Sequence, residues 1–366
     1  MTNKIIYKSI SSMQNFIKTS FQKLGVSEKD AAVCANILIT SDQRGIQSHG
    51  IGRLRMYLDR IERGLIEVKN TSEIIKESPT TAVIDGNHGI GMVIGFHAMN
   101  LAIKKAKVYG LGAVAVRNSS HFGIDGYYPL MAVKNNMIGM SFTNARPAVA
   151  PTFSIQPTLG TNPIAFGAPT DEKFPFLFDA ATSITQRGKI EVLNRQEKEA
   201  YEGWTIGNNG EPLTDPQTIL DMLMAKKAAL LPLGGVSEDS GGHKGYGLST
   251  IVEILSSSLQ SGAFLFALSG FDPQGEETRF KVGHFFLALN IENFLPIEQF
   301  KKNIGDLLRE LRSVNKYPGK DRIYTAGEKE YEIEKTIMEK GIPINTNLLS
   351  DLKYIDTLLG IGEFIS

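Results

Sequence analysis

Cysteine and long apolar stretches are both scarce in this sequence. The 366 residues include one cysteine, Cys34, which cannot form a disulfide within the chain, so a reducing compartment fits. Cys34 lies in the apolar run 31–35, where a small buried core residue is the expected role. No apolar run approaches the roughly 20 residues that a membrane-spanning helix needs, and the polar residues 1–9 show no signal peptide. We therefore expect a cytoplasmic protein without a membrane partner.

Net charge is also absent, because 39 basic residues offset 39 acidic ones. A neutral chain has no electrostatic drive toward nucleic acid or an anionic membrane, so neither is expected as a partner. Apolar residues make up 42% of the chain and charged residues 21%, which is typical of a globular protein. A local basic pocket for a small anion is compatible with this balance.

Several common site motifs are missing as well. The Gly-rich segment 89–95 is one residue longer than the dinucleotide-binding pattern, and no acidic residue follows in a strand at the expected distance. A glycine turn that leads into a helix is the better interpretation. The sequence has no His-x-x-x-His, no cysteine cluster and no Gly-x-Ser-x-Gly, so it predicts neither a metal site nor a nucleophile elbow.

Regular elements are predicted from the periodicity of apolar residues. In the first 65 residues, Ser12 and Ser27 are expected to cap two helices, and a third helix ends at Gly64. Strands are expected near 82–84, 112–116, 138–142, 164–166, 176–178 and 282–291. Further helices are expected near 95–109, 127–134, 245–259, 296–311, 330–340 and 346–359.

The order of these elements predicts the domain organisation. Strands and helices alternate in the middle of the chain, which indicates an α/β core. We expect this core to cover residues 76–292 and to bind cofactor and substrate. The helices of residues 1–75 and 293–366 are expected to pack together as one helical lobe.

Two histidines stand in polar segments that suit acid–base chemistry. His49 and Arg53 are four residues apart and share a face if their segment begins a helix. An arginine can hold a carboxylate with two parallel hydrogen bonds while an imidazole faces a hydroxyl, as a 2-hydroxy acid requires. His121 lies directly after a predicted strand, where α/β proteins place sites. A surface pair for His49 and Arg53, and a structural role for His121, are the alternatives.

The other four histidines are expected to be structural: His88, His97, His243 and His284. Arg146 follows a predicted strand and precedes Pro147, which favours a fixed guanidinium that could bind the second carboxylate if the substrate is a diacid. A surface arginine is the alternative interpretation of Arg146.

Taken together, these segments resemble the malate/L-lactate dehydrogenase superfamily, which does not use a Rossmann fold. Its members include malate, sulfolactate and ureidoglycolate dehydrogenases and a diketogulonate reductase. The resemblance covers nearly the whole chain, in family order, through the segments Ser48–Tyr57, Asn118–Gly123, Thr143–Asn144, Val149–Pro151, Leu159–Phe166, Asp179–Ser183, Gly188–Lys189, Thr214–Pro216, Leu231–Gly234, Lys244–Leu248 and Gly327–Glu328. Two departures are Thr152–Ser154 in place of Trp-Gly-Gly, and Gly207 in place of an aspartate.

The resemblance implies a fold and an activity. The fold is of the α/β (α+β) class, with a non-Rossmann nicotinamide-binding domain built on a large mixed or antiparallel sheet. The activity is hydride transfer between NAD and a small 2-hydroxy acid, with malate and oxaloacetate as the expected pair. A homodimer with sites near the subunit interface is also implied. The alternatives are lactate, sulfolactate or ureidoglycolate as substrate, or a non-catalytic nicotinamide-binding subunit.

The resemblance also implies roles for individual residues. His121 and His49 are placed near the nicotinamide, and His121 is preferred as the group that exchanges the proton. Substrate contacts are expected from Ser48, Arg53, Tyr57, Asn144 and Arg146, with Arg53 on the C1 carboxylate. Cofactor contacts are expected from Gly160, Thr161, Asn162, Asp179, Thr182, Ser183, Lys244, Gly327 and Glu328. Glu328 beside the adenosine ribose would repel a 2′-phosphate, which favours NAD over NADP.

Overall fold

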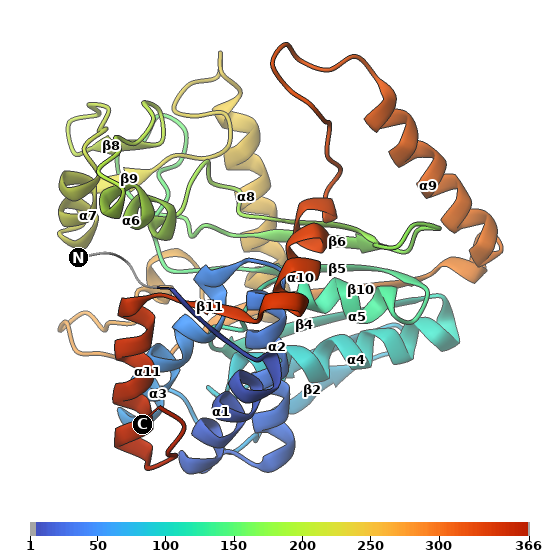
Figure 1. Ribbon diagram of the computed structural model, residues 1–366, viewed down its shortest axis with the longest axis horizontal. Helices are drawn as coiled ribbons and strands as arrows, with labels where there is room; N and C mark the ends of the chain where they lie inside the picture. The colour runs from blue at the N-terminus through green and yellow to red at the C-terminus, as the bar shows by residue number, and fades with distance from the viewer. Residues whose placement is uncertain (1–4, 365–366) are drawn as a thin grey trace.

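A seven-stranded mixed sheet forms the centre of the computed structural model, which describes residues 5–364 (Figure 1). The strand order is β2-β3-β4-β10-β5-β6-β7. β3 and β4 are parallel, and the other neighbours are antiparallel. The strands of this sheet are β2 (Glu73–Glu77), β3 (Thr81–Asp85), β4 (Leu111–Ser119), β5 (Met137–Thr143), β6 (Ile164–Ala168), β7 (Phe176–Ala180) and β10 (Val282–Asn290). A large mixed sheet is what the family resemblance implied.

The two faces of the sheet are covered differently. On one face lie α4 (Gly91–Tyr109) and α5 (Tyr127–Val133), which pack on β4, β10, β5 and β6. The other face packs against α8 (Gly242–Ser256), which places Val252 in a cluster with Ala115, Phe142 and Phe285. Figure 1 shows α8 above the sheet and α9 (Ile297–Ser313) extending outward to the right.

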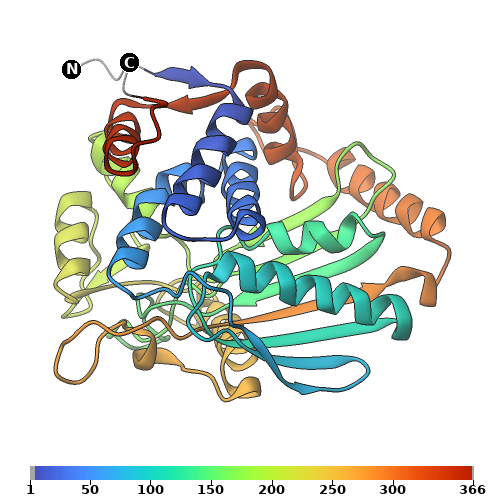
Figure 2. The same cartoon turned by 90° about the horizontal axis from the view of Figure 1, so that it is seen from below.

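Helices from both ends of the chain lie together beyond α4 and α5. α2 (Glu28–Gln43) contacts α4 and α5, α1 (Ile10–Lys23) contacts α2 and α11 (Thr346–Leu359), and α10 (Glu328–Lys340) contacts α2. The short strand β1 (Ile6–Lys8) pairs with β11 (Ile342–Ile344) and joins the first described residues to the last elements. Figure 2 shows these blue and red elements side by side.

One apolar cluster continues from these helices into the central layers, from Met13 on α1 to Phe286 on β10. Cys34 is fully buried in this cluster, as the sequence predicted. The boundaries at residues 75/76 and 292/293 between lobe and core stay predictions. Within residues 5–364, no helix combines the length and apolar character of a membrane span.

A smaller unit beside the sheet was not predicted from the sequence. It consists of α6 (Arg187–Arg195), α7 (Pro216–Met224) and the two-stranded sheet of β8 (Thr205–Gly207) and β9 (Ala228–Leu230). Its own apolar cluster contains Ile190, Ile219 and Leu230. Short elements of three to nine residues carry too little periodicity for detection in the sequence alone.

Three local predictions are wrong in detail. Ser9, and not Ser12, caps α1, because the Ser9 hydroxyl accepts a hydrogen bond from the backbone N–H of Ser12. The helix expected from residue 95 begins at Gly91. The segment with His49 and Arg53 does not begin an α-helix but forms two 3₁₀ turns, η1 (Gln47–His49) and η2 (Ile51–Arg53), before α3 (Leu54–Glu62). The two side chains therefore do not share one α-helical face.

Candidate active site

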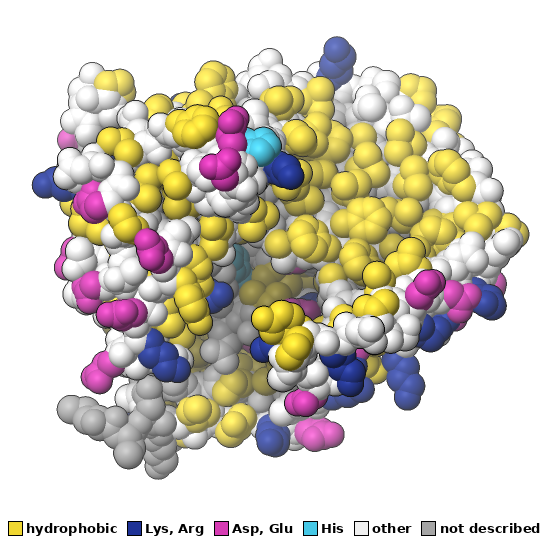
Figure 3. Space-filling model, turned by 90° about the horizontal axis from the view of Figure 1, so that it is seen from above, with side chains coloured by type: hydrophobic (Ala, Val, Ile, Leu, Met, Phe, Trp, Pro, Cys, Tyr) yellow, Lys and Arg dark blue, Asp and Glu magenta, His cyan; other side chains and the backbone are white. Residues whose placement is uncertain are grey.

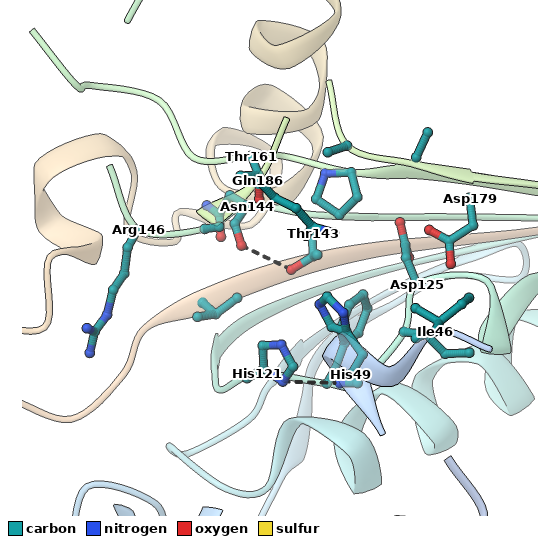
Figure 4. A pocket seen from close by; sticks show the side chains of 18 of the residues that line it. Ile46, His49, His121, Asp125, Thr143, Asn144, Arg146, Thr161, Asp179 and Gln186 are labelled. Carbon is teal, nitrogen blue, oxygen red and sulfur yellow. Dashed lines mark hydrogen bonds between the residues drawn. The ribbon is translucent and has the colours of Figure 1, made fainter. Parts of the chain in front are cut away.

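A cavity of about 450 Å³ lies between the helices of the N-terminal part and the ends of the central strands. Its size is typical of a pocket for a small ligand. Figure 4 shows its side chains pointing inward from several elements, with Arg146 and His121 on one side and Asp125 and Asp179 on the other. The hollow at the centre of the face in Figure 3 shows that the molecule is open to solvent on this side. The predicted residues that line the cavity are His49, His121, Asn144, Arg146, Thr161 and Asp179.

His121 is fixed in the loop that follows β4. The Ser120 hydroxyl accepts a hydrogen bond from Gly91 N and donates one to Gly89 O, both at 2.9 Å, so the glycine turn before α4 anchors this loop. The turn has a packing role, because a Cβ on Gly91 would lie 2.1 Å from the Ser120 carbonyl oxygen. This observation agrees with the predicted glycine turn into a helix.

The hydrogen bonds of His121 define its proton position. Its Nδ1 lies 2.6 Å from the Tyr57 hydroxyl and 3.4 Å from the Gly123 nitrogen, and a backbone N–H can only donate. Nδ1 therefore accepts, and the neutral ring carries its proton on Nε2. Burial, followed by the charges of His49 and Arg53, holds the pKa of His121 well below its ordinary value.

His49 stacks on His121, with ring centroids 5.4 Å apart. Its Nδ1 lies 2.9 Å from the Ser48 hydroxyl. Burial, and then the charge of Arg53, lower the pKa of His49 to about 4. Two stacked imidazoles beside an arginine are thus both neutral near pH 7, and only one of them can take a proton at low cost.

A buried carboxyl group shapes the turn that carries His49. Asp42 on α2 accepts a hydrogen bond from Ile51 N at 2.7 Å, and a Cβ on Gly50 would overlap the same carboxyl group. Burial raises the pKa of Asp42 to about 7. The Ser48-His49-Gly50 sequence therefore folds around Asp42, which sequence reasoning did not identify.

Three arginines lie near the histidines without a carboxylate partner among the described residues. Arg53 donates from Nε to the backbone oxygen of Ser48. Arg60 lies two turns further along α3 and lines the cavity. Arg146 lines it from the loop after β5. Arg60 was missed by sequence reasoning, although a spacing of seven residues from Arg53 is a signal for the same helix face.

Asp125 and Asp179 form the opposite wall of the cavity. Asp125 accepts a hydrogen bond from the Ser141 hydroxyl through one oxygen, and its other oxygen is buried without a hydrogen-bond partner among residues 5–364. Asp179 accepts from Gly126 N at 2.8 Å. Burial, together with the charge of Asp179, raises the pKa of Asp125 well above its ordinary value. This wall therefore contains one neutral carboxyl group, that of Asp125, and one oxygen of that group remains available to bind a ligand.

Several predicted ligand contacts use their side chains within the protein. The Asn144 and Asn162 amides both donate to Glu253, and Asn162 also accepts from Ala145 N. A Cβ on Gly160 would lie 2.6 Å from Ala145 O. Gly160, Asn144 and Asn162 therefore fix the end of β5, which carries Arg146.

Comparison with known proteins identifies the relatives of this chain. The family model described as malate/L-lactate dehydrogenase matches residues 9–353. The chain belongs to the malate/L-lactate dehydrogenase family. It is therefore an oxidoreductase of 2-hydroxy acids.

Individual relatives of this family member cover almost its full length. The malate dehydrogenase of Pyrococcus horikoshii is 45% identical over 95% of this chain and 94% of that protein. The malate/(S)-sulfolactate dehydrogenase of Methanothermus fervidus is 38% identical over 92% of this chain and 94% of that protein. The crystal structure of malate dehydrogenase from Entamoeba histolytica superposes with a TM-score of 0.94 at 44% identity, and covers 98% of this chain and 99% of that chain.

Two departures from the family pattern lie outside the cavity. Phe153, in the segment that replaces Trp-Gly-Gly, is 75% exposed and has a φ of +68°. Gly207 ends β8 and begins the turn 207–210. Neither segment contributes a side chain to the wall around His121.

A second hollow of about 280 Å³ shares Ile46, Asp179 and Glu330 with the main cavity. Gly327 lines it, as does Arg44, which is only 7% exposed and whose Nε has no hydrogen-bond partner in the described part of the chain. The two hollows together form a path from the histidines past Asp179 to Gly327.

The other expected cofactor residues, Thr182, Ser183, Lys244 and Glu328, line neither hollow. Thr182 donates to the Asn162 carbonyl oxygen and Ser183 to that of Thr185, and both side chains are buried. Lys244 is exposed in the first turn of α8 and lines neither hollow. The Glu328 carboxylate is 2% exposed and forms ion pairs with Arg312 and Arg322. Its charge is neutralised by these arginines, so the expected repulsion of a 2′-phosphate by Glu328 has no basis.

Proposed function

We propose that this dehydrogenase interconverts malate and oxaloacetate with NAD(H), and that His121 exchanges the substrate proton. The observation that carries the proposal is the convergence of two neutral imidazoles with Arg60 and Arg146 in one cavity, while the charge of Arg53 acts on both imidazoles from outside the lining. A dicarboxylate supplies the negative charge that these cations lack among the described residues. Relatives named malate dehydrogenase, at 45% identity, support the same substrate.

The residues along the two hollows fit a nicotinamide dinucleotide. The cofactor, when bound, takes up or delivers the hydride. Nε of Arg44 and one oxygen of Asp125 are buried polar atoms without a hydrogen-bond partner among residues 5–364, as expected for a wall that receives a polar ligand. Thr161 and Asp179 line the cavity, and Gly327 lines the second hollow. The positively and negatively charged side chains that line the second hollow are equal in number. No additional cation is therefore present there to bind a 2′-phosphate, which favours NAD over NADP.

His121 exchanges the substrate proton, and Tyr57 orients the His121 ring by a hydrogen bond. In the reduction of oxaloacetate, Nε2 of the protonated ring donates a proton to the oxygen that arises at C2. The neutral ring that remains carries its proton on Nδ1, where the Tyr57 hydroxyl accepts and turns its own proton toward the His121 carbonyl oxygen 3.4 Å away. This tautomer leaves Nε2 free to take the proton back when malate is oxidised. Tyr57 therefore positions His121 in both protonation states rather than contacting the substrate.

Substrate charge and histidine protonation are coupled in this arrangement. Burial and the neighbouring cations disfavour the imidazolium of His121 while the cavity holds no anion. Two carboxylates offset the charge of the arginines and so favour the imidazolium that reduction requires. His121 is therefore protonated most readily when the dianionic substrate is bound.

The test is a panel of 2-oxo acids, followed by the absorbance of reduced nicotinamide. Oxaloacetate should be preferred over pyruvate, because a monoacid leaves buried arginine unpaired, at a cost of about 3–5 kcal/mol. Arg146→Ala should lower the rate of oxaloacetate reduction selectively and so reduce the preference for oxaloacetate over pyruvate. Preference for pyruvate or a ureido acid would show that the malate assignment is wrong, and inactivity toward the whole panel would favour a non-catalytic subunit.

Sulfolactate is the second candidate substrate. A sulfonate is an anion that the same arginines can bind, and the relative from Methanothermus fervidus is named for both malate and (S)-sulfolactate. Sulfopyruvate therefore belongs in the panel. The ratio of kcat/KM for oxaloacetate and sulfopyruvate decides between the two candidates.

Cofactor preference is tested by fluorescence titration with NADH and NADPH. NADH should bind more tightly. Lys244→Ala should raise the dissociation constant about tenfold or more if its ammonium reaches a cofactor phosphate. An unchanged constant would remove Lys244 from the cofactor site.

The oligomer that we propose is a homodimer. Hydrophobic side chains gather on the face that carries α8 and α9, as Figure 3 shows. Exposed residues on these helices include Leu248, Ile251, Ile254, Leu307 and Leu311. Extended apolar patches on soluble proteins commonly bind another subunit, and identical chains most often form twofold dimers.

A further inference from the structure

We propose that Arg60 and Arg146, which both contact the ring of Phe280, act together as the clamp for the second carboxylate of the substrate. The proposal rests on malate dehydrogenase activity and adds Arg60 and Phe280 as residues that determine specificity. The guanidinium carbon of Arg60 lies 4.3 Å from the ring centroid of Phe280, and that of Arg146 lies 4.8 Å from the same centroid. All three side chains line the cavity that contains His121.

The two cations approach one ring from separate parts of the chain. Arg60 comes from α3, the helix that also places Tyr57 against His121. Arg146 follows β5, and its neighbour Ala145 is held by Asn162. Phe280 is 5% exposed, and its carbonyl oxygen lies 2.8 Å from Nδ1 of His88. A fixed ring in contact with both arginines limits the freedom of both guanidinium groups, so less entropy is lost when an anion binds.

The clamp carries charge that the described residues do not neutralise. Neither Arg60 nor Arg146 forms an ion pair there, in contrast to Arg55 and Arg63 on the same stretch of chain, which pair with Asp351 and Glu277. Cation–ring contact offsets only a part of the repulsion between like charges. Burial, together with the nearby charge of Arg146, lowers the pKa of Arg60 to about 10. A carboxylate between them removes this repulsion and supplies hydrogen-bond acceptors.

The clamp lies inside the cavity, in contrast to Arg53. Arg53 does not line the cavity, and its Nε donates to the Ser48 carbonyl oxygen. Arg60 stands seven residues further along the chain and lines the cavity, and Arg146 lies on the His121 side of the cavity in Figure 4. The second carboxylate of the substrate binds at the clamp, and the first lies beside the imidazoles. A monoacid fills only the first of these positions.

The decisive experiment compares Arg60→Gln with Arg55→Gln, an arginine of the same helix that is paired outside the cavity. We expect Arg60→Gln to lower kcat/KM for oxaloacetate by about 10- to 100-fold, the loss of one charge-assisted hydrogen bond, mainly through KM. Pyruvate reduction should change by less than about threefold, and Arg60→Lys should restore part of the loss. Arg55→Gln should leave both substrates unaffected. An equal loss for both substrates in Arg60→Gln would overturn the clamp.

Binding of malonate provides a second measurement that does not depend on turnover. Malonate, a dianion, should raise the Tm of the wild-type protein, and acetate should not. The rise of Tm with malonate should be smaller in each of the variants Arg60→Gln, Arg146→Ala and Phe280→Leu. In the double variant of Arg60 and Arg146, the reduction of this rise should be less than the sum of the reductions in the two single variants. Strict additivity would contradict a shared site. A wild-type enzyme that prefers pyruvate yet loses malonate binding in Arg60→Gln would reject malate as substrate while retaining the clamp.

Discussion

The two cavity histidines differ in the contacts that hold them, and this difference supports the proposed role of His121 in proton exchange. His121 accepts from Tyr57 and Gly123 through Nδ1, so its Nε2 faces the cavity with a defined proton. His49 contacts only the small and rotatable hydroxyl of Ser48 through its Nδ1. A catalytic acid or base must keep one orientation through the reaction, and Tyr57 provides this for His121. His49 is better suited to donate a hydrogen bond to the substrate.

Replacement of His121 tests this assignment. His121→Gln should lower turnover by about 10²–10⁴-fold with nearly unchanged cofactor affinity, because only the proton transfer is lost. Steady-state kinetics and an NADH titration measure the two quantities. A variant with near wild-type turnover, beside an inactive His49→Gln, would reverse the roles of the two histidines.

Asp42 gives the folded state an unusual dependence on pH. The pKa of this carboxyl group is about 7 in the folded chain and about 4 in the unfolded chain, so the folded state holds an extra proton between these values. The stability contributed by this proton is complete below about pH 4 and is lost as the pH rises toward 7. His49 acts in the opposite sense, because its lowered pKa removes stability as the pH falls below about 6.5.

An Asp42→Asn variant isolates the contribution of the carboxyl group. Asparagine retains an oxygen for Ile51 N but does not titrate. The stability of Asp42→Asn relative to the wild type should therefore rise by about 2–3 kcal/mol from about pH 5 to about pH 8. Urea unfolding of both proteins at the two pH values measures this change. The same difference at both values would show that Asp42 is ionised throughout.

At the scale of elements, the start of α4 and the loop after β4 depend on each other. Gly91 begins α4 beneath the backbone of Ser120, and Ser120 precedes His121. Gly91→Ala should destabilise the fold by about 1–3 kcal/mol through overpacking, and should lower turnover because the His121 loop must shift. Thermal or urea unfolding and steady-state kinetics measure the two effects.

Gly247 on α8 is the matched control, because a Cβ there meets nothing within 4 Å. Gly247→Ala should be neutral or gain up to about 1 kcal/mol, since alanine restricts the unfolded chain. Equal stability changes in the two variants would argue against the close approach at Gly91.

Most elements of the central sheet could be predicted, because apolar alternation and long apolar periodicity are local signals. The strands β3 to β7 and β10, and the helices α4, α5 and α8 to α11, all lie where the sequence places them within a few residues. β1 and β11 have three residues each and pair across almost the whole chain, so no local signal exists for them. The same holds for Asp125, whose importance arises only when distant segments meet at the cavity.

At the scale of the whole molecule, the exposed apolar side chains of α9 predict association. Leu307 and Leu311 lie one turn apart on this helix, and each is 51% exposed. Replacement of both by Asp should convert a dimer to monomers, because charged groups would be buried at the interface. Sedimentation velocity measures the change.

Val108→Asp, on α4 at a side chain that is 69% exposed, is the control and should leave the dimer intact. A wild-type protein that sediments as a monomer would show that the homodimer proposal is wrong.

The pairing of β1 with β11 has a consequence for synthesis of the protein. α3, which carries Arg60, contacts α11, and α2, which contacts the turn with His49, also contacts α10, while the buried Ile342 and Ile344 belong to the same apolar core. α10, β11 and α11 are translated long after α1, α2 and α3. A nascent chain that has not yet made them lacks part of the core beneath the cavity, so we expect the wall with His49 and Arg60 to form only after they are translated.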